Sequence, residues 1–328
     1  MKVCFVFRKP QAGYFSIEKI FQQIAELLGK TVQTEQQFVP GSRVTPRDMI
    51  RNWRFALQLE ADVYHVTGDV HYLVLGLPGK KTILTIHDCV FLHTTSGIKR
   101  SVLKWLFLDL PVRHCRTITT ISEKSRQEII RFSGCSPEKV VVIPNPVSAN
   151  FIRADKVFNS DQPAILFIGS TPNKNLIRVI EALKGIHCLL TIIGKVDADK
   201  AAQLKAAGIP YRSLTGISEQ ELANEYAACD LVLFPSTYEG FGLPIIEAQQ
   251  SGRAVITSAI SPMKEVAGDG ACLVDPFDVT AIRHGVQKVI DDAGYRRTLI
   301  EKGLGNVKQY EISSVADKYL SVYQNVVR

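Results

Sequence analysis

The sequence predicts an α/β protein built from two Rossmann-like halves. Three observations lead to this fold class. Short apolar β-rich runs alternate with helical patterns, the alternation stops at PNPV (144–147), and it then restarts. Strands that alternate with helices are typical of a parallel, doubly wound sheet. Two prolines within three residues exclude a regular helix at the interruption, and a length of 328 residues favours two domains.

The individual elements follow from local patterns. Strands of the first half are expected at 2–7, 62–66, 82–86, 117–121 and 139–143. Residues 16–28 carry apolar side chains at helical spacing, which predicts the first helix. A polar linker is expected to about Gln162, and strands of the second half at 164–168, 189–194, 230–234, 254–258 and 271–274. We expect a first domain over 1–155 and a second over 156–310.

Composition narrows the class of protein. The chain is 46% hydrophobic, yet no run approaches the ~20 apolar residues of a membrane span. The apolar stretch at the N-terminus is too short for a signal peptide. Seven scattered cysteines without a CxxC pair indicate reduced thiols, and neither a disulfide framework nor a zinc site. A cytoplasmic protein is the expectation.

The stretch PSTYEGFGLPIIEAQQSG (235–252) carries most of the functional information. An apolar strand precedes it, and Pro244 suits the first turn of a helix. The segment therefore reads as strand, glycine loop and helix start, which is an anion site suited to a diphosphate. Glu239 and Glu247 flank this site and could accept hydrogen bonds from hydroxyl groups. A nucleotide sugar combines these two chemistries.

The same residues resemble a known family. E-(x7)-E within YEGFGLP, followed by a small-residue helix and AVITS, is similar to the donor signature of retaining glycosyltransferases of family 4. EVAGDGACLVDP (265–276) extends the match, and nearly the whole chain fits. The resemblance implies the GT-B fold, in which two Rossmann-like domains face a cleft and a C-terminal helix (311–328) crosses back to the first domain. The first domain would bind the acceptor and the second the nucleotide sugar. A simple strand-to-helix turn would not require two glutamates at this spacing.

By this resemblance, the donor lies between the two glutamates. Glu239 would bind hydroxyls of the donor sugar, and Glu247 would accept the ribose hydroxyls. Backbone N–H groups expected to assist are those of Gly240, Phe241, Gly242 and Leu243.

The loop GSTPNKN (169–175) supplies a candidate cation. Lys174 stands at a helix start, where a positive charge opposes the dipole unless an anion is present. A donor diphosphate would be that anion, and Lys195 could assist. The family usually places an arginine and a lysine here, whereas this chain has Ser170 and Asn173 where basic residues are expected. Gly169, Ser170 and Asn173 are nevertheless assigned to the donor site, and solvated lysines are the alternative reading.

Further candidates follow other expected strands. His87 comes just after a strand, and the resemblance places it near the donor sugar, where it would donate to a hydroxyl; a structural histidine is the alternative. Together with Glu239 and Lys174 it forms the expected catalytic set. The residues expected on the acceptor side are Asp69, His71 and Asp88.

Three residues are assigned to the donor through backbone contacts. Gly13, in the loop 8–16, could let the backbone approach the donor phosphate closely. By resemblance, Gly216 and Ile217 lie near the nucleotide base. Ser218 and Glu221 after them have the spacing of a helix capping box.

No metal or cofactor is expected. Asp197 and Asp199 imitate the DxD motif of the other major glycosyltransferase fold, but nothing else in the chain resembles that fold. We therefore interpret this pair as a solvated loop.

Charge is divided unevenly between the halves. Residues 1–160 hold 22 Lys+Arg and 13 Asp+Glu, a net +9, whereas 161–328 hold 17 and 19, a net −2. An arginine stripe is expected on one helix, at Arg43, Arg47, Arg51 and Arg54. A second basic group, Lys99, Arg100, Lys104, Arg113 and Arg116, surrounds the apolar run VLKWLFL. Peripheral contact with anionic membrane at its inner face and ordinary solvation both explain this charge.

The sequence thus predicts a metal-independent, retaining hexosyltransferase. It would move sugar from a nucleotide diphosphate sugar to a glycan or lipid-linked acceptor, in surface polysaccharide biosynthesis, with no nucleic-acid partner. Two alternatives stay open: a non-catalytic sugar-nucleotide-binding subunit, and a sugar-nucleotide epimerase on the same fold.

Overall fold

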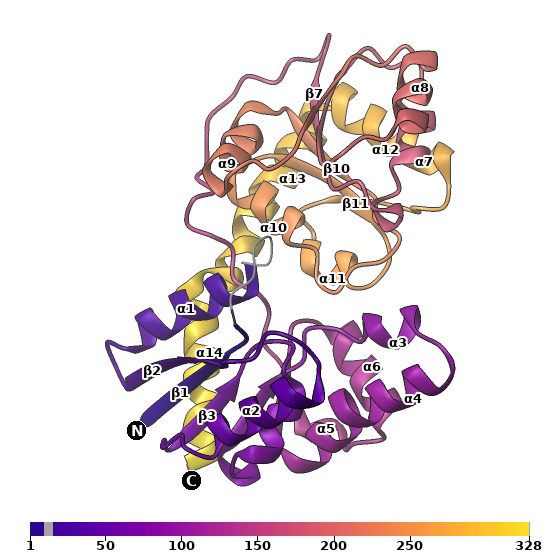
Figure 1. The fold of residues 1–328 in the computed structure, drawn as a ribbon. Coiled ribbons are helices and arrows are strands. Elements are labelled where there is room, and N and C mark those ends of the chain that lie inside the picture. The colour runs from indigo at the N-terminus through magenta and orange to yellow at the C-terminus, as the bar shows by residue number, and fades with distance from the viewer. Residues whose placement is uncertain (10–15, 328) are drawn as a thin grey trace. The chain divides into compact units, whose positions relative to one another are not determined.

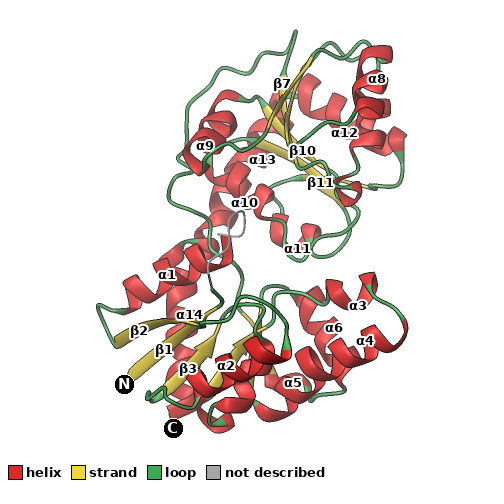
Figure 2. Ribbon diagram, viewed as in Figure 1, coloured by secondary structure: helices red, strands yellow, loops and turns green. Residues whose placement is uncertain are grey.

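The computed structural model describes residues 1–9 and 16–327, and the chain divides into two compact units. The first comprises Met1–Pro146 with Ile312–Arg328, and the second comprises Val147–Glu311 (Figure 1). In each unit helices alternate with the strands of one six-stranded sheet (Figure 2). All strand pairs in both sheets are parallel, as the alternation predicted.

The sheet of the first unit has the order β2-β1-β3-β4-β5-β6. Its strands are β1 Lys2–Phe7, β2 Gln33–Phe38, β3 Val63–Val66, β4 Thr82–Thr85, β5 Thr117–Thr120 and β6 Val140–Val142. Its longer helices are α1 Ser16–Leu28, α2 Pro46–Ala56, α4 Gly97–Lys104, α6 Glu123–Ser133 and α14 Ile312–Val327. Shorter helical segments are η1 His71–Gly76, η2 Gly79–Lys81, α3 Val90–Thr94, the π-helical turn η3 Trp105–Asp109, α5 Leu110–His114 and η4 Pro137–Lys139.

The sheet of the second unit has the order β12-β11-β10-β7-β8-β9. Its strands are β7 Ala164–Ile168, β8 Leu189–Ile193, β9 Tyr211–Leu214, β10 Leu231–Phe234, β11 Ala254–Ser258 and β12 Cys272–Val274. Its helical elements are η5 Pro172–Lys174, α7 Leu176–Leu183, α8 Ala198–Ala206, α9 Glu219–Ala228, α10 Leu243–Gln250, α11 Met263–Ala267, α12 Val279–Asp291, α13 Ala293–Asn306 and η6 Val307–Tyr310. Counted within this unit, the strand order is the 3-2-1-4-5-6 of a dinucleotide-binding domain.

The C-terminal helix α14 belongs to the core of the first unit, as the family resemblance implied. It packs beside α1 (Figure 1), and its tyrosines join the aromatic cluster over β1. The hydroxyl of Tyr323 lies 2.7 Å from Nδ1 of His65, and Nε2 of that ring lies 2.7 Å from Oγ1 of Thr85. Complete burial lowers the pKa of His65 to about 3. This neutral histidine therefore links β3, β4 and α14.

The linker joins the second unit earlier than expected. The division falls between Pro146 and Val147, ahead of the expected boundary at residue 155. The N–H of Val147 donates to the carbonyl of Tyr310 at 2.8 Å, and Phe151 packs edge-on against Tyr226 with ring centroids 5.2 Å apart. These contacts tie the start of the linker to the second unit.

The arginine stripe expected on one helix lies only partly on it. Helix α2 begins after its N-cap Thr45, so Arg43 precedes the helix and only Arg47, Arg51 and Arg54 lie on it.

All seven cysteines are free; six are buried and Cys135 is partly exposed. Within residues 1–9 and 16–327, no helix combines the length and apolar character needed to cross a bilayer.

Candidate functional site

The strand order of the second unit reverses between β7 and β10. From β7 the chain moves outward to β8 and β9, and it then returns to place β10 on the other side. The loops that leave β7 and β10 therefore diverge, and ligands of open α/β sheets bind at such a point. These two loops, 169–175 and 235–242, are the segments for which the sequence predicted donor contacts.

A lysine and a glutamate join the two loops. Nζ of Lys174 lies 2.7 Å from Oε1 of Glu239, and both side chains are more than four-fifths buried. The same ammonium lies 4.8 Å from the ring centre of Phe234, at the end of β10. A Cβ at Gly169, whose φ is +93°, would approach Cε of Lys174 to 2.8 Å, so the lysine packs where only glycine fits. The carboxylate thus explains how a cation is tolerated beside the start of α7.

Two asparagines hold the loops in place. Nδ2 of Asn173 donates to the carbonyl of Tyr238 at 2.9 Å, and its own carbonyl accepts from the N–H of Thr237 at 2.8 Å. Asn175 is the N-cap of α7, with a left-handed φ of 70°. Its buried Nδ2 donates to the carbonyls of Pro235, at 3.0 Å, and Pro276, at 2.6 Å. Asn175 was not predicted, although asparagine's tolerance of this conformation before an apolar helix was a usable signal.

The start of α10 provides backbone donors. Gly242 is its N-cap with a φ of +109°, and Pro244 falls in its first turn. The first N–H groups of a helix have no acceptor within the helix, so Leu243 and its neighbours present the positive end of the dipole. Phe241 is buried edge-on against Tyr310, with centroids 5.8 Å apart, which supports the loop that contains Gly240.

Glu247, on the second turn of α10, has an unusual environment. The hydroxyl of Tyr226, from α9, donates to its Oε2 at 2.7 Å, and that tyrosine is fully buried. Burial raises the pKa of Glu247 to about 7, although the hydroxyl and the charge of Lys174 oppose the rise. Tyr226 was missed because only the fold brings α9 beside α10.

Two family models together cover most of the chain. Residues 148–305 match the model described as "Glycosyl transferases group 1", and residues 24–151 match "Glycosyltransferase Family 4". The first match contains the whole site built above. The chain belongs to the family 4 glycosyltransferases.

Relatives agree with this assignment. The glycosyltransferase is 28% identical to O-antigen chain mannosyltransferase B of Escherichia coli over 80% of this chain and 74% of that protein. It is 27% identical to the MMP alpha-(1->4)-mannosyltransferase of Mycolicibacterium hassiacum over 70% of this chain, but spans only 60% of that relative. The structure of Anabaena Alr3699/HepE in complex with UDP and glucose has a TM-score of 0.76 at 16% identity, covering 99% and 100% of the two chains. The glycosyltransferase therefore has the GT-B fold.

Other residues predicted in the donor half lie around the same sheet edge. A Cβ at Gly194, after β8, would meet Oγ of Ser170 at 2.9 Å, so the loops after β7 and β8 touch there. Lys195 follows at an exposed position. Asp197 is the N-cap of α8, accepting from the N–H of Lys200 at 2.9 Å, and Asp199 lies in the first turn of that helix. Both are exposed, as expected, but the pair begins a helix and does not form a loop.

The loop predicted near the base follows β9. Gly216 has a φ of +67°, and Ile217 is partly buried. The predicted capping box is confirmed: the N–H of Glu221 donates to Oγ of Ser218 at 3.2 Å, and the N–H of Ser218 donates to Oε2 of Glu221 at 2.7 Å.

In the first unit, the side chain of His87 is buried and forms a hydrogen bond within the protein. Its ring is 8% exposed, and Nε2 lies 3.0 Å from the carbonyl of Thr67. Since a carbonyl can only accept, Nε2 carries the hydrogen. A neutral ring then offers Nδ1 only as an acceptor, so the expected donation to a sugar hydroxyl would require a protonated imidazole.

The residues predicted on the acceptor side differ in accessibility. Asp69 is exposed and accepts from Nη1 of Arg8 at 2.8 Å, while Asp88 accepts from the N–H of Val90 at 3.0 Å. His71 is buried and donates from Nδ1 to the carbonyl of Phe107 at 2.7 Å. Burial lowers its pKa, and within the described part of the chain its Nε2 has no hydrogen-bond partner. Gly13 lies outside the described residues.

Proposed function

We propose that this glycosyltransferase moves a hexosyl group from a nucleotide diphosphate sugar to a glycan or lipid-linked acceptor, with retention of configuration. The observation that carries the proposal is the Lys174–Glu239 pair at the strand-order reversal of the second unit. The names of the mannosyltransferase relatives support a role in surface polysaccharide biosynthesis.

Each residue of the proposed site has a distinct task. Lys174 and the first N–H groups of α10 would stabilise the negative charge that develops on the departing diphosphate. Donors held in place before the reaction cost no reorganisation, which makes such electrostatic stabilisation effective. Glu239, oriented by Lys174, would accept from the donor sugar, and Glu247 would accept from the ribose.

Substitution of the two glutamates separates these tasks. We expect Glu239→Ala to abolish transfer, whereas Glu247→Ala should chiefly raise the Kd for the donor. Glu225→Ala is a matched control, because Glu225 is equally shielded but pairs with Arg212 away from the site. Transfer rates can be measured with a panel of nucleotide sugars after circular dichroism has verified folding. Wild-type kinetics in both site variants would refute the assignment.

The stereochemistry has a direct measurement. If the leaving group departs and the acceptor arrives on the same face of the sugar, an α-configured donor yields an α-linked product. NMR of the first product formed reports this through the one-bond coupling constant between the anomeric carbon and its hydrogen. A β-linked first product would contradict retention.

Catalysis without a metal or other cofactor is also proposed. Lys174 and the helix start can neutralise a diphosphate, which is the task that a metal ion would otherwise perform. Transfer should therefore survive EDTA. Loss of activity on chelation, restored by Mn²⁺ or Mg²⁺, would show the opposite.

Exposed apolar side chains support peripheral contact of the first unit with a membrane. On α4 and the turn after it, Ile98, Val102 and Trp105 occur at helical spacing and are 85%, 53% and 54% exposed. Lys99 and Arg100 flank them. Such a basic amphipathic segment suits the interface of an anionic bilayer, where each basic side chain contributes about 1 kcal/mol. On α2, Ile50 and Trp53 are exposed beside Arg47, Arg51 and Arg54, and the C-cap residue Leu57 is exposed as well.

Liposome co-sedimentation tests this contact. Binding should require anionic lipid, decrease with salt, and fall in an Ile98→Ser/Val102→Ser/Trp105→Ser variant that still binds donor. An Arg47→Glu/Arg51→Glu/Arg54→Glu variant tests α2 separately. If the wild-type protein ignores anionic vesicles at low salt, the acceptor must be reached from solution.

A further inference from the structure

A pocket of about 500 Å³ lies in the second unit, at the sheet edge where the strands begin. It is lined by linker residues 153–156 and 158, by the positions just before β10 and β11, and by one side of α13. Ligands of the proposed transfer bind at the opposite edge, beyond the ends of the strands. The pocket is therefore separate from the Lys174–Glu239 site.

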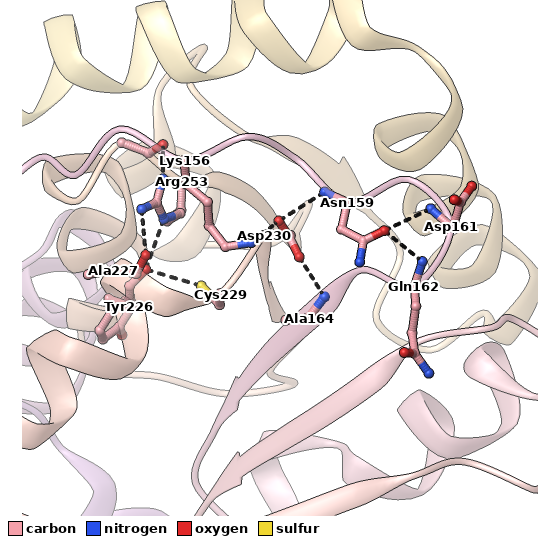
Figure 3. Close-up of polar contacts among 11 residues, drawn as sticks. Lys156, Asn159, Asp161, Gln162, Ala164, Tyr226, Ala227, Cys229, Asp230 and Arg253 are labelled. Atoms are coloured by element: carbon pink, nitrogen blue, oxygen red, sulfur yellow. Dashed lines mark hydrogen bonds and ion pairs between the residues drawn. The ribbon is translucent and has the colours of Figure 1, made fainter.

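The charge of the lining is positive. It contains five cations, Arg153, Lys156, Arg253, Arg296 and Arg297, and three carboxylates, Asp155, Asp230 and Glu301. The carboxylate of Asp230 already has three hydrogen-bond donors. It accepts from Nζ of Lys156 and from the N–H groups of Asn159, at 3.2 Å, and Ala164, at 2.8 Å (Figure 3). The other two carboxylates lie at the rim in exposed pairs with Arg153 and Arg297.

Two arginines of the lining, Arg253 and Arg296, have no carboxylate paired with them among the residues that the structure describes. The first, Arg253, is 5% exposed. Its Nε donates to the carbonyl of Tyr226 at 2.9 Å and its Nη2 to that of Ala227 at 2.7 Å, at the C-terminal end of α9 (Figure 3). Burial lowers its pKa. Its Nη1 donates to the carbonyl of Gly252 at 3.3 Å. Within the described residues no carboxylate oxygen lies within 4 Å of this guanidinium, so all its hydrogen bonds go to carbonyls, and Asp230 and Asp155 favour its charge only from a greater distance.

Arg296 has the same arrangement at another helix. Its Nη1 donates to the carbonyls of Val289, at 2.6 Å, and Ile290, at 2.9 Å, at the end of α12. Its guanidinium stacks 3.6 Å above the ring centre of Phe158. Across the described part of the chain, its Nε and Nη2 make no hydrogen bond and it has no carboxylate partner. These N–H groups remain available to a ligand.

We propose that this pocket binds a small ligand with a phosphate group on an apolar body. Guanidinium groups bind phosphate oxygens through paired N–H donors, and Arg253 and Arg296 are partly desolvated and fixed by their helix ends. Phe158, Ile300 and Leu304 supply the apolar wall. No residue of the pocket belongs to the proposed transfer site, so the ligand is an additional one.

Phenyl phosphate is a suitable probe, with isothermal titration calorimetry as the measurement. We expect one molecule to bind per chain, and to bind equally to a Lys174→Ala variant, in which the transfer site is impaired. Arg296→Gln should weaken binding at least tenfold. Arg283→Gln is the matched control, because Arg283 also caps a helix, through the carbonyls of Ala182 and Lys184, but lies outside the pocket.

A second variant keeps the test valid if Arg296→Gln does not fold. Arg297→Glu changes an exposed side chain at the rim and should weaken binding several-fold while leaving the circular dichroism spectrum unchanged. The proposal is overturned if wild-type protein shows no binding at millimolar phenyl phosphate, if Lys174→Ala abolishes the binding, or if Arg297→Glu and Arg296→Gln both bind as wild type does.

Discussion

Glu247 is a carboxyl group whose ionisation is governed by its burial. With a pKa raised to about 7, it binds a proton in the folded protein that the unfolded chain has already lost. Its contribution to the free energy of unfolding therefore falls as pH rises from about 4.5 to about 7. A ribose hydroxyl needs the ionised acceptor, so donor affinity should rise as the pH passes through about 7, where Glu247 of the folded protein loses its proton. Calorimetric donor titrations between pH 5.5 and 8.5 measure this, and Glu247→Gln should bind weakly with a flat profile.

Tyr226 can be tested in the same experiment. Tyr226→Phe removes the hydrogen bond that stabilises the ionised carboxylate, so the midpoint of the donor-affinity curve should move to higher pH. Tyr211→Phe, at an exposed edge strand, is the control. An unchanged midpoint in Tyr226→Phe would show that the hydroxyl only fills space.

At the scale of elements, the sequence predicted apolar strands well and missed two polar strands at sheet edges. Every apolar run that was expected to be a strand is one, within a residue or two at each end. The two strands that were missed, β2 and β9, lie at sheet edges and read QTEQQF and YRSL. An edge strand is partly exposed and need not be apolar, so a polar one lacks the apolar run from which β6 and β12, also at edges, were predicted. The contacts of Asn175 and Tyr226 form only in the folded chain, so local patterns could not show them. Glu239 and Glu247 stood out by their spacing, and Lys174 by its place at a helix start.

The start of α7 depends on one side chain. Asn175→Ala would remove hydrogen bonds to two loops and place a Cβ residue in a left-handed conformation without compensation. We expect a loss of about 2–4 kcal/mol in the free energy of unfolding. Asn175→Gly keeps the backbone conformation and should lose less, so urea denaturation of both variants separates strain from hydrogen bonding. Equal losses would mean that the conformation carries no strain.

At the scale of the whole molecule, the first unit requires the last residues of the chain. Tyr323→Phe would leave Nδ1 of the buried His65 without its partner, at a cost of about 1–3 kcal/mol. Truncation after Glu311 should be far worse, because it removes α14 and exposes the aromatic cluster over β1. Thermal melts should show a lower Tm for the first change and an unfolded first unit for the second. A truncated protein that melts like the full chain would contradict this account.

The distribution of thiols has a practical consequence for observing this enzyme at work. Burial raises the pKa of Cys4, Cys89, Cys115, Cys188, Cys229 and Cys272, so these side chains are protonated and shielded from reagents. Cys135, just after α6, is the one partly exposed thiol. A maleimide dye should therefore attach once per native chain, and one added surface cysteine in the second unit would complete a fluorescence pair without deleting a natural residue. Motion of the two units during turnover could then be followed directly.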